Sequence, residues 1–344
     1  TTTNSNVTFS STVDGDGTAR DLIIDTNGNT GTILFDGLVG NSNDLDAITI
    51  TGNLDLDAAI ANTTSISVSG TSNLGANVTT SGTQTYTGAT TLSGGDRILT
   101  GSTVNFGAAV TGTTSHDLII TGNLDLDGAL TDVVDLSVSG TSNLGANVTT
   151  SGTQTYTGAV TLSTDVTLTT TDSNVTFSST VDGDGTARDL TLTLGSGSAT
   201  FSGIVGTTSL ADITLNSSAT FNAALTADNL TIAANKTATV KDDVTIASTI
   251  ALSGSSTLAV LNASSMTIAG TITDTGSGNT ISVNDSTANA TPDEVTFSGT
   301  VAADTLTIGS STTAGKAKFT GSGGVTIANI TITGGNHADE DSTG

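Results

Sequence analysis

The chain has 344 residues, including 41 Gly, one Pro and one Met but no Cys or Trp, and only 11% of its residues are charged. Thirty-two acidic and seven basic residues give a formal charge of −25, so the clustered Lys and Arg required for nucleic-acid binding are missing. The lack of Cys excludes disulfides and thiolate metal sites, and no apolar run approaches the roughly 18 residues of a membrane-spanning helix.

Strand-like sequence opens the chain and recurs along it. Val7-Thr8-Phe9 alternates apolar and polar residues, and Val13 follows four residues after Phe9. We place each such apolar pair on one strand. Between pairs lies a second alternating stretch, often opened by Asp, as in Asp21-Leu22-Ile23-Ile24. The recurring pairs are Phe9/Val13, Phe35/Val39, Leu56/Ile60, Leu74/Val78, Phe106/Val110, Leu126/Leu130, Leu144/Val148, Leu162/Val166, Phe177/Val181, Phe201/Val205, Phe221/Leu225, Val240/Val244 and Phe297/Val301.

This spacing predicts an all-β fold, a single continuous parallel β-solenoid with rungs of about 19 residues. We expect it to be a right-handed β-helix with Val, Leu, Ile and Phe facing inward and Thr, Ser, Asn and Asp facing outward. A β-sandwich array is the alternative, but it would need longer alternating runs and units of about 100 residues. Since no linker interrupts the pattern, residues 1–344 are expected to form one repeat domain ending in a polar acidic tail, residues 334–344.

Large blocks of the sequence occur twice. Residues 120–127 and 138–159 repeat residues 50–57 and 68–89 at an offset of 70, and Ser173–Leu190 repeats Ser5–Leu22 at an offset of 168. Verbatim duplication suits a stacked array, because every unit meets the same neighbours. At about 19 residues per rung, the offset of 70 predicts a span of about four rungs. Strand-like sequence precedes the second copy of the opening block only, so we expect an excerpt or repeating unit of a longer array.

A family resemblance rests on three strings: Asn174-Val-Thr-Phe-Ser-Ser-Thr-Val181, Ser151-Gly-Thr-Gln-Thr-Tyr-Thr-Gly158 and Asp189-Leu-Thr-Leu192. They resemble the repeats of filamentous-haemagglutinin-like adhesins and related β-strand-repeat proteins of bacterial surfaces. The resemblance covers nearly the whole chain and lies in composition and rung length. It implies an extracellular or bacterial cell-surface location and a structural or adhesive fibre segment. We expect self-association, end to end or side to side, and contacts with surface glycans.

Catalysis is not expected from the composition. His116 and His337 are the only histidines, and no Cys accompanies them. A β-helix that cleaves sugars would gather acids and aromatic side chains in one groove. Most Phe residues instead fall at inward positions, and Tyr86 and Tyr156 are the same residue of two copies. A carbohydrate-binding or carbohydrate-processing β-helix therefore stays an alternative to the fibre.

A cation-binding or ice-binding solenoid is a further alternative. Outward threonines, as in Leu168-Thr-Thr-Thr171 and Thr191-Leu192-Thr193, are typical of a flat row of hydroxyl groups. Exposed strands also favour Thr for packing reasons alone. Along the sequence Thr is mixed with Ser, Asn, Asp and Gly at the corresponding places, which weighs against a regular ice-matching face.

Two acidic turns are candidate calcium ligands. Asp14-Gly15-Asp16-Gly17 and its copy with Asp182 and Asp184 resemble fragments of calcium loops, and Ca²⁺ prefers oxygen ligands from flexible acidic turns. The remainder of an EF-hand loop is missing, since its sixth position holds Ala19 or Ala187. The predicted solenoid requires no cofactor. These aspartates either bind Ca²⁺ or, as the simpler alternative, belong to turns exposed to solvent.

The aspartates that open strands form a second acidic feature. If successive rungs align, Asp117 lies about 5 Å from Asp135, and Asp212 lies equally close to Asp228. Like charges at this distance repel each other, and staggering, screening by sodium or bridging cations would each relieve the repulsion.

We predict that divalent cations raise the melting temperature modestly, because a bridging cation would relieve this repulsion in the folded state only. Thermal unfolding in calcium and in a chelator measures the effect. An identical melting temperature in the two conditions would contradict the cation hypothesis.

Overall fold

A computed structural model describes residues 1, 5–26, 30–112, 115–208, 210–262, 266–285, 294–309 and 315–333, so the expected tail 334–344 lies outside the described residues. Within them the chain is all-β, with 36 strands and no helix. It is a parallel β-solenoid with rungs of about 20 residues, which confirms the expected fold class and rung length. The chain divides into two compact units, residues 1–176 and 177–344. The single continuous domain and the right-handed winding stay predictions.

The strands are short, and many of them have only three or four residues. Those of the first unit are β1 (Val7–Phe9), β2 (Leu22–Asp25), β3 (Thr32–Phe35), β4 (Leu45–Thr51), β5 (Asn53–Leu56), β6 (Ile60–Val68), β7 (Ser72–Leu74), β8 (Val78–Thr80), β9 (Thr83–Tyr86), β10 (Thr90–Leu92), β11 (Arg97–Phe106), β12 (Val110–Thr111), β13 (Leu118–Leu126), β14 (Leu130–Val133), β15 (Leu136–Val138), β16 (Ser142–Leu144), β17 (Val148–Thr150), β18 (Gln154–Tyr156), β19 (Val160–Leu162) and β20 (Val166–Thr169).

Strand β21 (Val175–Phe177) includes the boundary between the units. The strands of the second unit are β22 (Val181–Gly183), β23 (Arg188–Thr193), β24 (Ser198–Phe201), β25 (Leu210–Leu215), β26 (Ser218–Phe221), β27 (Leu225–Ile232), β28 (Thr237–Val240), β29 (Val244–Leu252), β30 (Thr257–Asn262), β31 (Met266–Asp274), β32 (Thr280–Asp285), β33 (Glu294–Phe297), β34 (Val301–Ile308), β35 (Lys316–Phe319) and β36 (Val325–Ile332).

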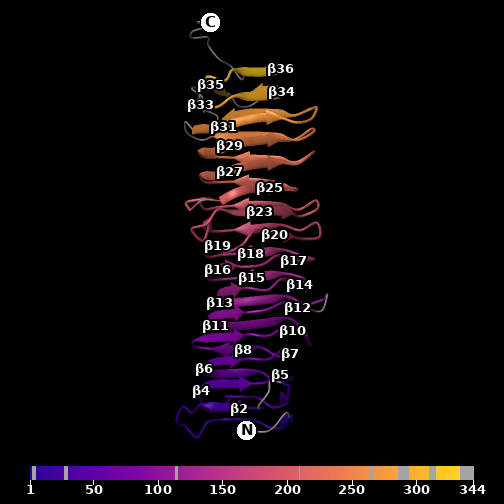
Figure 1. Ribbon diagram of the computed structural model, residues 1–344, viewed down its shortest axis with the longest axis vertical. Coiled ribbons are helices and arrows are strands. Elements are labelled where there is room, and N and C mark those ends of the chain that lie inside the picture. The colour runs from indigo at the N-terminus through magenta and orange to yellow at the C-terminus, as the bar shows by residue number, and fades with distance from the viewer. Residues whose placement is uncertain are drawn as a thin grey trace. The chain divides into compact units, whose positions relative to one another are not determined.

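Each rung of the first unit has three sides, which we call A, B and C. In one rung these are β7, β8 and β9. In the next rung β10 pairs with β7, the beginning of β11 pairs with β8, and the end of β11 pairs with β9. Figure 1 shows the successive layers from β4 to β13 stacked on one another. Every side therefore continues from rung to rung as a parallel ladder.

The apolar pairs four residues apart flank corners of the rung. Leu74 ends β7 and Val78 begins β8, and Phe106 ends β11 while Val110 begins β12. All four side chains are buried. The expectation that each pair lies on one strand was wrong. Residues four apart share a face on a continuous strand too, so the spacing alone does not distinguish a strand from a corner at which both residues face inward.

Inward side chains form columns because the rungs align in register. In the second unit Phe201 is paired with Phe221, and the rings of Phe177, Phe201 and Phe221 stack with centroids 4.7 Å apart at each step. All three are buried. This distance equals the usual spacing of neighbouring strands, about 4.8 Å, so the backbone ladder places the rings at stacking distance.

The two copies at an offset of 70 lie on different sides of the first unit. Tyr86 pairs with Val68 and Phe106, at the end of β11, and therefore lies on side C. Tyr156 pairs with Val138, whose column passes through Ile120 to Leu99, at the beginning of β11, on side B. Counted along the strands, the offset spans three whole rungs and two further sides. This agrees with the expected span of about four rungs, and the remaining side turns the second copy relative to the first.

The two copies nevertheless make the same internal contacts. The hydroxyl of Tyr86 donates to Oε1 of Gln84 and that of Tyr156 donates to Oε1 of Gln154, both over 3.1 Å. The Gln84 amide donates to the backbone oxygen of Thr100 over 2.8 Å, and that of Gln154 donates to the oxygen of Thr169 over 3.0 Å. A side of the rung, rather than a whole rung, is therefore the unit that the duplication preserves.

Candidate functional site

Aspartates at the entrance to side B bind the backbone of the following rung. Oδ1 of Asp96 accepts a hydrogen bond from the backbone N–H of Asp117, and Oδ1 of Asp117 accepts one from the N–H of Asp135, both over 3.1 Å. Asp135 in turn accepts from the hydroxyl of Thr153 over 2.9 Å. Leu118 and Leu136 are in register, so the expected alignment of Asp117 with Asp135 is confirmed. Each carboxylate leans toward the next rung and caps a backbone donor there.

The corresponding expectation for Asp212 and Asp228 was wrong. Asp212 is in register with Asn229, whose side-chain amide donates to Oδ1 of Asp212 over 2.7 Å. The backbone N–H of Asp212 donates to Oδ1 of Asp189 over 3.0 Å. The register follows from the buried pair Ile213 and Leu230, which fixes the preceding residues opposite each other. Asp228 is displaced by one position, so an amide rather than a second carboxylate meets Asp212.

Asparagine fulfils the same capping role elsewhere in the first unit. Oδ1 of Asn53 accepts from the N–H of Thr71, and Oδ1 of Asn123 accepts from the N–H of Thr141, both over 2.9 Å. Asp and Asn share the acceptor oxygen that this bond needs. The frequent Asp at the start of a strand is thus explained by the structure of the corner and needs no ligand.

The four calcium candidates all have partners within the chain. Oδ1 of Asp14 accepts from the N–H of Ser42 over 2.9 Å, and Oδ1 of Asp182 accepts from the N–H of Thr208 over the same distance. The two remaining carboxylates form ion pairs four residues along the chain, Asp16 with Arg20 over 3.2 Å and Asp184 with Arg188 over 2.8 Å.

These ion pairs change the acidity of the two aspartates. The hydrogen bond from Arg188 holds the pKa of Asp184 at about 2, below its ordinary value of 3.8. The hydrogen bond from Arg20 lowers the pKa of Asp16 in the same way. Among the described residues, no group of three or more His, Cys, Asp or Glu is arranged to hold a metal ion. Calcium binding at Asp14, Asp16, Asp182 and Asp184 stays a prediction.

The tyrosines lie in the core, and the described histidine lies beside an aspartate. Tyr86 and Tyr156 are fully buried, and burial raises the pKa of both phenols. Nδ1 of His116 lies 3.8 Å from Oδ1 of Asp96, at the entrance to side B. His337 lies outside the described residues.

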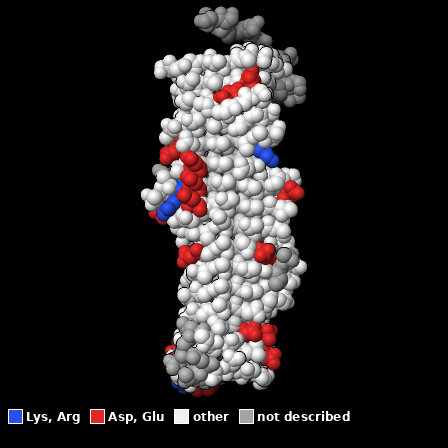
Figure 2. Space-filling view, turned by 45° about the vertical axis from the view of Figure 1, so that its right-hand side comes forward, with Lys and Arg blue, Asp and Glu red and all other residues white. Residues whose placement is uncertain are grey.

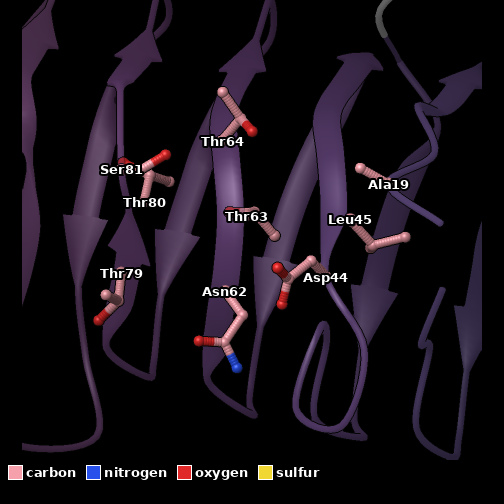
Figure 3. A pocket seen from close by; sticks show the side chains of 9 residues that line it. All are labelled: Ala19, Asp44, Leu45, Asn62, Thr63, Thr64, Thr79, Thr80 and Ser81. Atoms are coloured by element: carbon pink, nitrogen blue, oxygen red, sulfur yellow. The ribbon is translucent and has the colours of Figure 1, made fainter. Parts of the chain in front are cut away.

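The hollows on the first unit are shallow and polar, and they also occur in duplicate. One, of about 350 Å³, is lined by Asn62, Thr79 and Thr80 among others, and Figure 3 shows its side chains spread over neighbouring strands rather than converging. Its counterpart at Asp132, of about 210 Å³, lies 70 residues further along the chain. A second pair, about 240 and 260 Å³, surrounds Asn73 and its copy Asn143.

Two polar side chains in each hollow of the second pair are bonded to each other. The amide of Asn73 donates to Asp55, and the amide of Asn143 donates to Asp125, each over 2.8 Å. The buried hydroxyls of Ser72 and Ser142, which line the same hollows, have no hydrogen-bond partner among the described residues. The hollows can offer hydroxyl and amide contacts to a polar ligand, but the described residues lining them contain no pairing of a nucleophile with a base.

One side of the second unit presents two parallel columns of hydroxyl side chains. We call it the hydroxyl face. It is formed by β24, β26, β28, β30, β32, the end of β34 and the end of β36, all paired in register. Its two columns are Ser198, Ser218, Thr237, Thr257, Thr280, Thr305 and Asn329, and Thr200, Thr220, Thr239, Ala259, Ser282, Thr307 and Thr331.

The hydroxyl face differs from the rest of its unit in charge. None of its fourteen outward positions is charged, and twelve of them are Thr or Ser. Asp189 and Asp212 follow each other on another side, while Glu294 pairs with Lys316 and Lys318 on the third. Figure 2 shows carboxylates placed one above another on one flank, next to a broad area without charge. The sequence did not reveal this face, because residues of three sides alternate along the chain.

Comparisons with protein-family models, curated proteins and solved structures found no match for this chain. No described helix is long and apolar enough to cross a membrane.

The corner bonds predict a difference between two substitutions of Asp117. Asp117→Ala removes the acceptor for the N–H of Asp135 and should cost about 1 kcal/mol of folding free energy. Asp117→Asn keeps an acceptor oxygen and should cost less. Equilibrium unfolding in denaturant measures both values, and an equal loss in the two variants would show that the corner bond contributes nothing.

The Asp184–Arg188 pair predicts a pH dependence. Because the folded pKa of Asp184 lies below the ordinary value, the pair stabilises the fold fully above about pH 4 and loses this contribution as the pH falls toward 2. Arg188→Gln should raise the pKa of Asp184 toward 3.8, as measured by NMR titration of its carboxyl carbon. Arg20→Gln, which removes the copy of this pair, is the matched control and should leave Asp184 unchanged. Titration of Asp184 near pH 2 without Arg188 would refute the assignment.

Proposed function

We propose that this chain is a structural segment of an extracellular or cell-surface fibre, whose rungs set its length and whose outward faces contact its surroundings. The observation that carries the proposal is the placement of one duplicated block on two different sides with the same internal contacts. A binding or catalytic site would lose the arrangement of its residues if part of it were moved to another side of the rung. The backbone ladder and the core of a rod are unchanged by such a move.

The interior supports a mechanical role. Columns of buried Val, Leu, Ile and Phe run through both units, and parallel backbone hydrogen bonds connect successive rungs. Each rung therefore contacts only its neighbours, and a chain of this kind can be lengthened by adding sides without redesigning the core. The polar hollows are consistent with glycan contacts along the fibre.

The last described strand supports axial association. In β34 the inward residue Leu306 is buried, whereas Ile330, paired with it in β36, is 61% exposed, and Ile332 is 74% exposed. A further rung placed on β36 would bury these side chains. We propose that copies of the protein also associate end to end, and a head-to-tail contact of this kind builds an open fibre.

Removal of residues 81–150 tests the proposal, because Ser151 then follows Thr80 as Ser81 does in the intact chain. The variant should fold and form filaments like the intact protein, with an axial repeat shorter by about 18 Å, the height of three rungs and two sides. Electron microscopy of both proteins measures the repeat. Discrete particles from the intact chain would refute the fibre, whereas an unfolded deletion variant would refute the equivalence of the sides.

A further inference from the structure

We propose that the hydroxyl face of the second unit binds the surface of ice. This goes beyond the proposed fibre, because it assigns a ligand to one face of one unit.

The face has the regularity of a two-dimensional lattice. Along each strand the two outward positions, such as Ser218 and Thr220, are two residues apart, which is about 6.7 Å. Neighbouring rungs repeat them at about 4.8 Å, as in the column Thr200, Thr220 and Thr239. The register is unbroken in the described pairings from β24 to the end of β36. A ligand that fits such a surface over its whole length must itself be flat and periodic.

The side chains of the face are held in place before any ligand arrives. Thr has a β-branched side chain with few rotamers, so fixing it on binding costs little conformational entropy. From β24 to β34 the residues between the two columns point inward and are buried, as are Ala219 and Ala238. Within the described part of the chain, the hydroxyls of Thr220, Thr239 and Thr257 make no hydrogen bond. These hydroxyls can therefore bond to ordered water, while the threonine methyl groups fill the spaces between the water molecules.

The lack of charge on the hydroxyl face favours a neutral ligand such as the water lattice of ice. Charged side chains hold their own hydration shells, and the face carries none although the chain has a net charge of −25. A crystalline polysaccharide would also be flat and rich in hydroxyls. Its sugar rings, however, present C–H faces that pack well against aromatic rings, and the fourteen outward positions contain no aromatic residue. The face therefore favours ice, to which its many weak contacts would add along the rungs.

The test compares two lysine substitutions in the intact chain. Thr220→Lys places a charge on the hydroxyl face between Thr200 and Thr239. Thr214→Lys is the matched control on another side of the same unit, between Thr191 and Thr231. Both positions are outward and partly exposed, and circular dichroism and the melting temperature establish that both variants fold. The measurements are incorporation into a slowly growing ice crystal and thermal hysteresis.

We expect the intact chain and Thr214→Lys to enter the ice and show hysteresis, and Thr220→Lys to lose both. Exclusion of the intact chain from ice overturns the inference, and so does an equal loss in the two variants. Retention on microcrystalline cellulose that Thr220→Lys abolishes, without binding to ice, overturns it as well and assigns the face to a polysaccharide. The fibre proposal is tested separately by the 70-residue deletion, which lies in the first unit.

Discussion

The parallel backbone ladder between successive rungs is the constraint on which the rest of the structure depends. It holds each residue about 4.8 Å from its partner in the next rung and thereby turns a linear pattern into columns. The inward columns bring Phe177, Phe201 and Phe221 into stacked contact. The outward columns bring acids, amides or hydroxyls together in the same way. The residues that share a column therefore determine its charge, its hydrogen bonds and the ligands that it can contact.

Like charges in a column are accommodated by the backbone itself. Asp96, Asp117 and Asp135 follow one another, yet each directs a carboxylate oxygen to a backbone N–H of the next rung. A charge-assisted hydrogen bond of this kind offsets part of the repulsion between neighbours. The strongly acidic composition is thus compatible with a regular stack, and acidity alone does not identify a cation site.

Equivalence of the three sides explains why large blocks could be copied without regard to whole rungs. Gln84 and Gln154 occupy different sides and still bond to the same kinds of partner. Because a block can be turned by one side, its outward residues move to another face while its core contacts persist. The surface can therefore diversify while the scaffold is conserved, as the contrast between the uncharged hydroxyl face and its charged neighbours illustrates.

The sequence by itself determined the all-β solenoid, the length of its rungs and the inward or outward direction of most side chains, because alternation with a period of two is a local property of a strand. Only the tertiary structure decided which residues share a face. In the structure Leu74 and Val78 lie on either side of a corner, and Asn229 rather than Asp228 pairs with Asp212. The columns of the hydroxyl face lie on one side of the rung, although their residues alternate along the chain with residues of two other sides. Register depends on corners whose lengths vary and on buried partners about 20 residues away, and neither is visible in a local pattern.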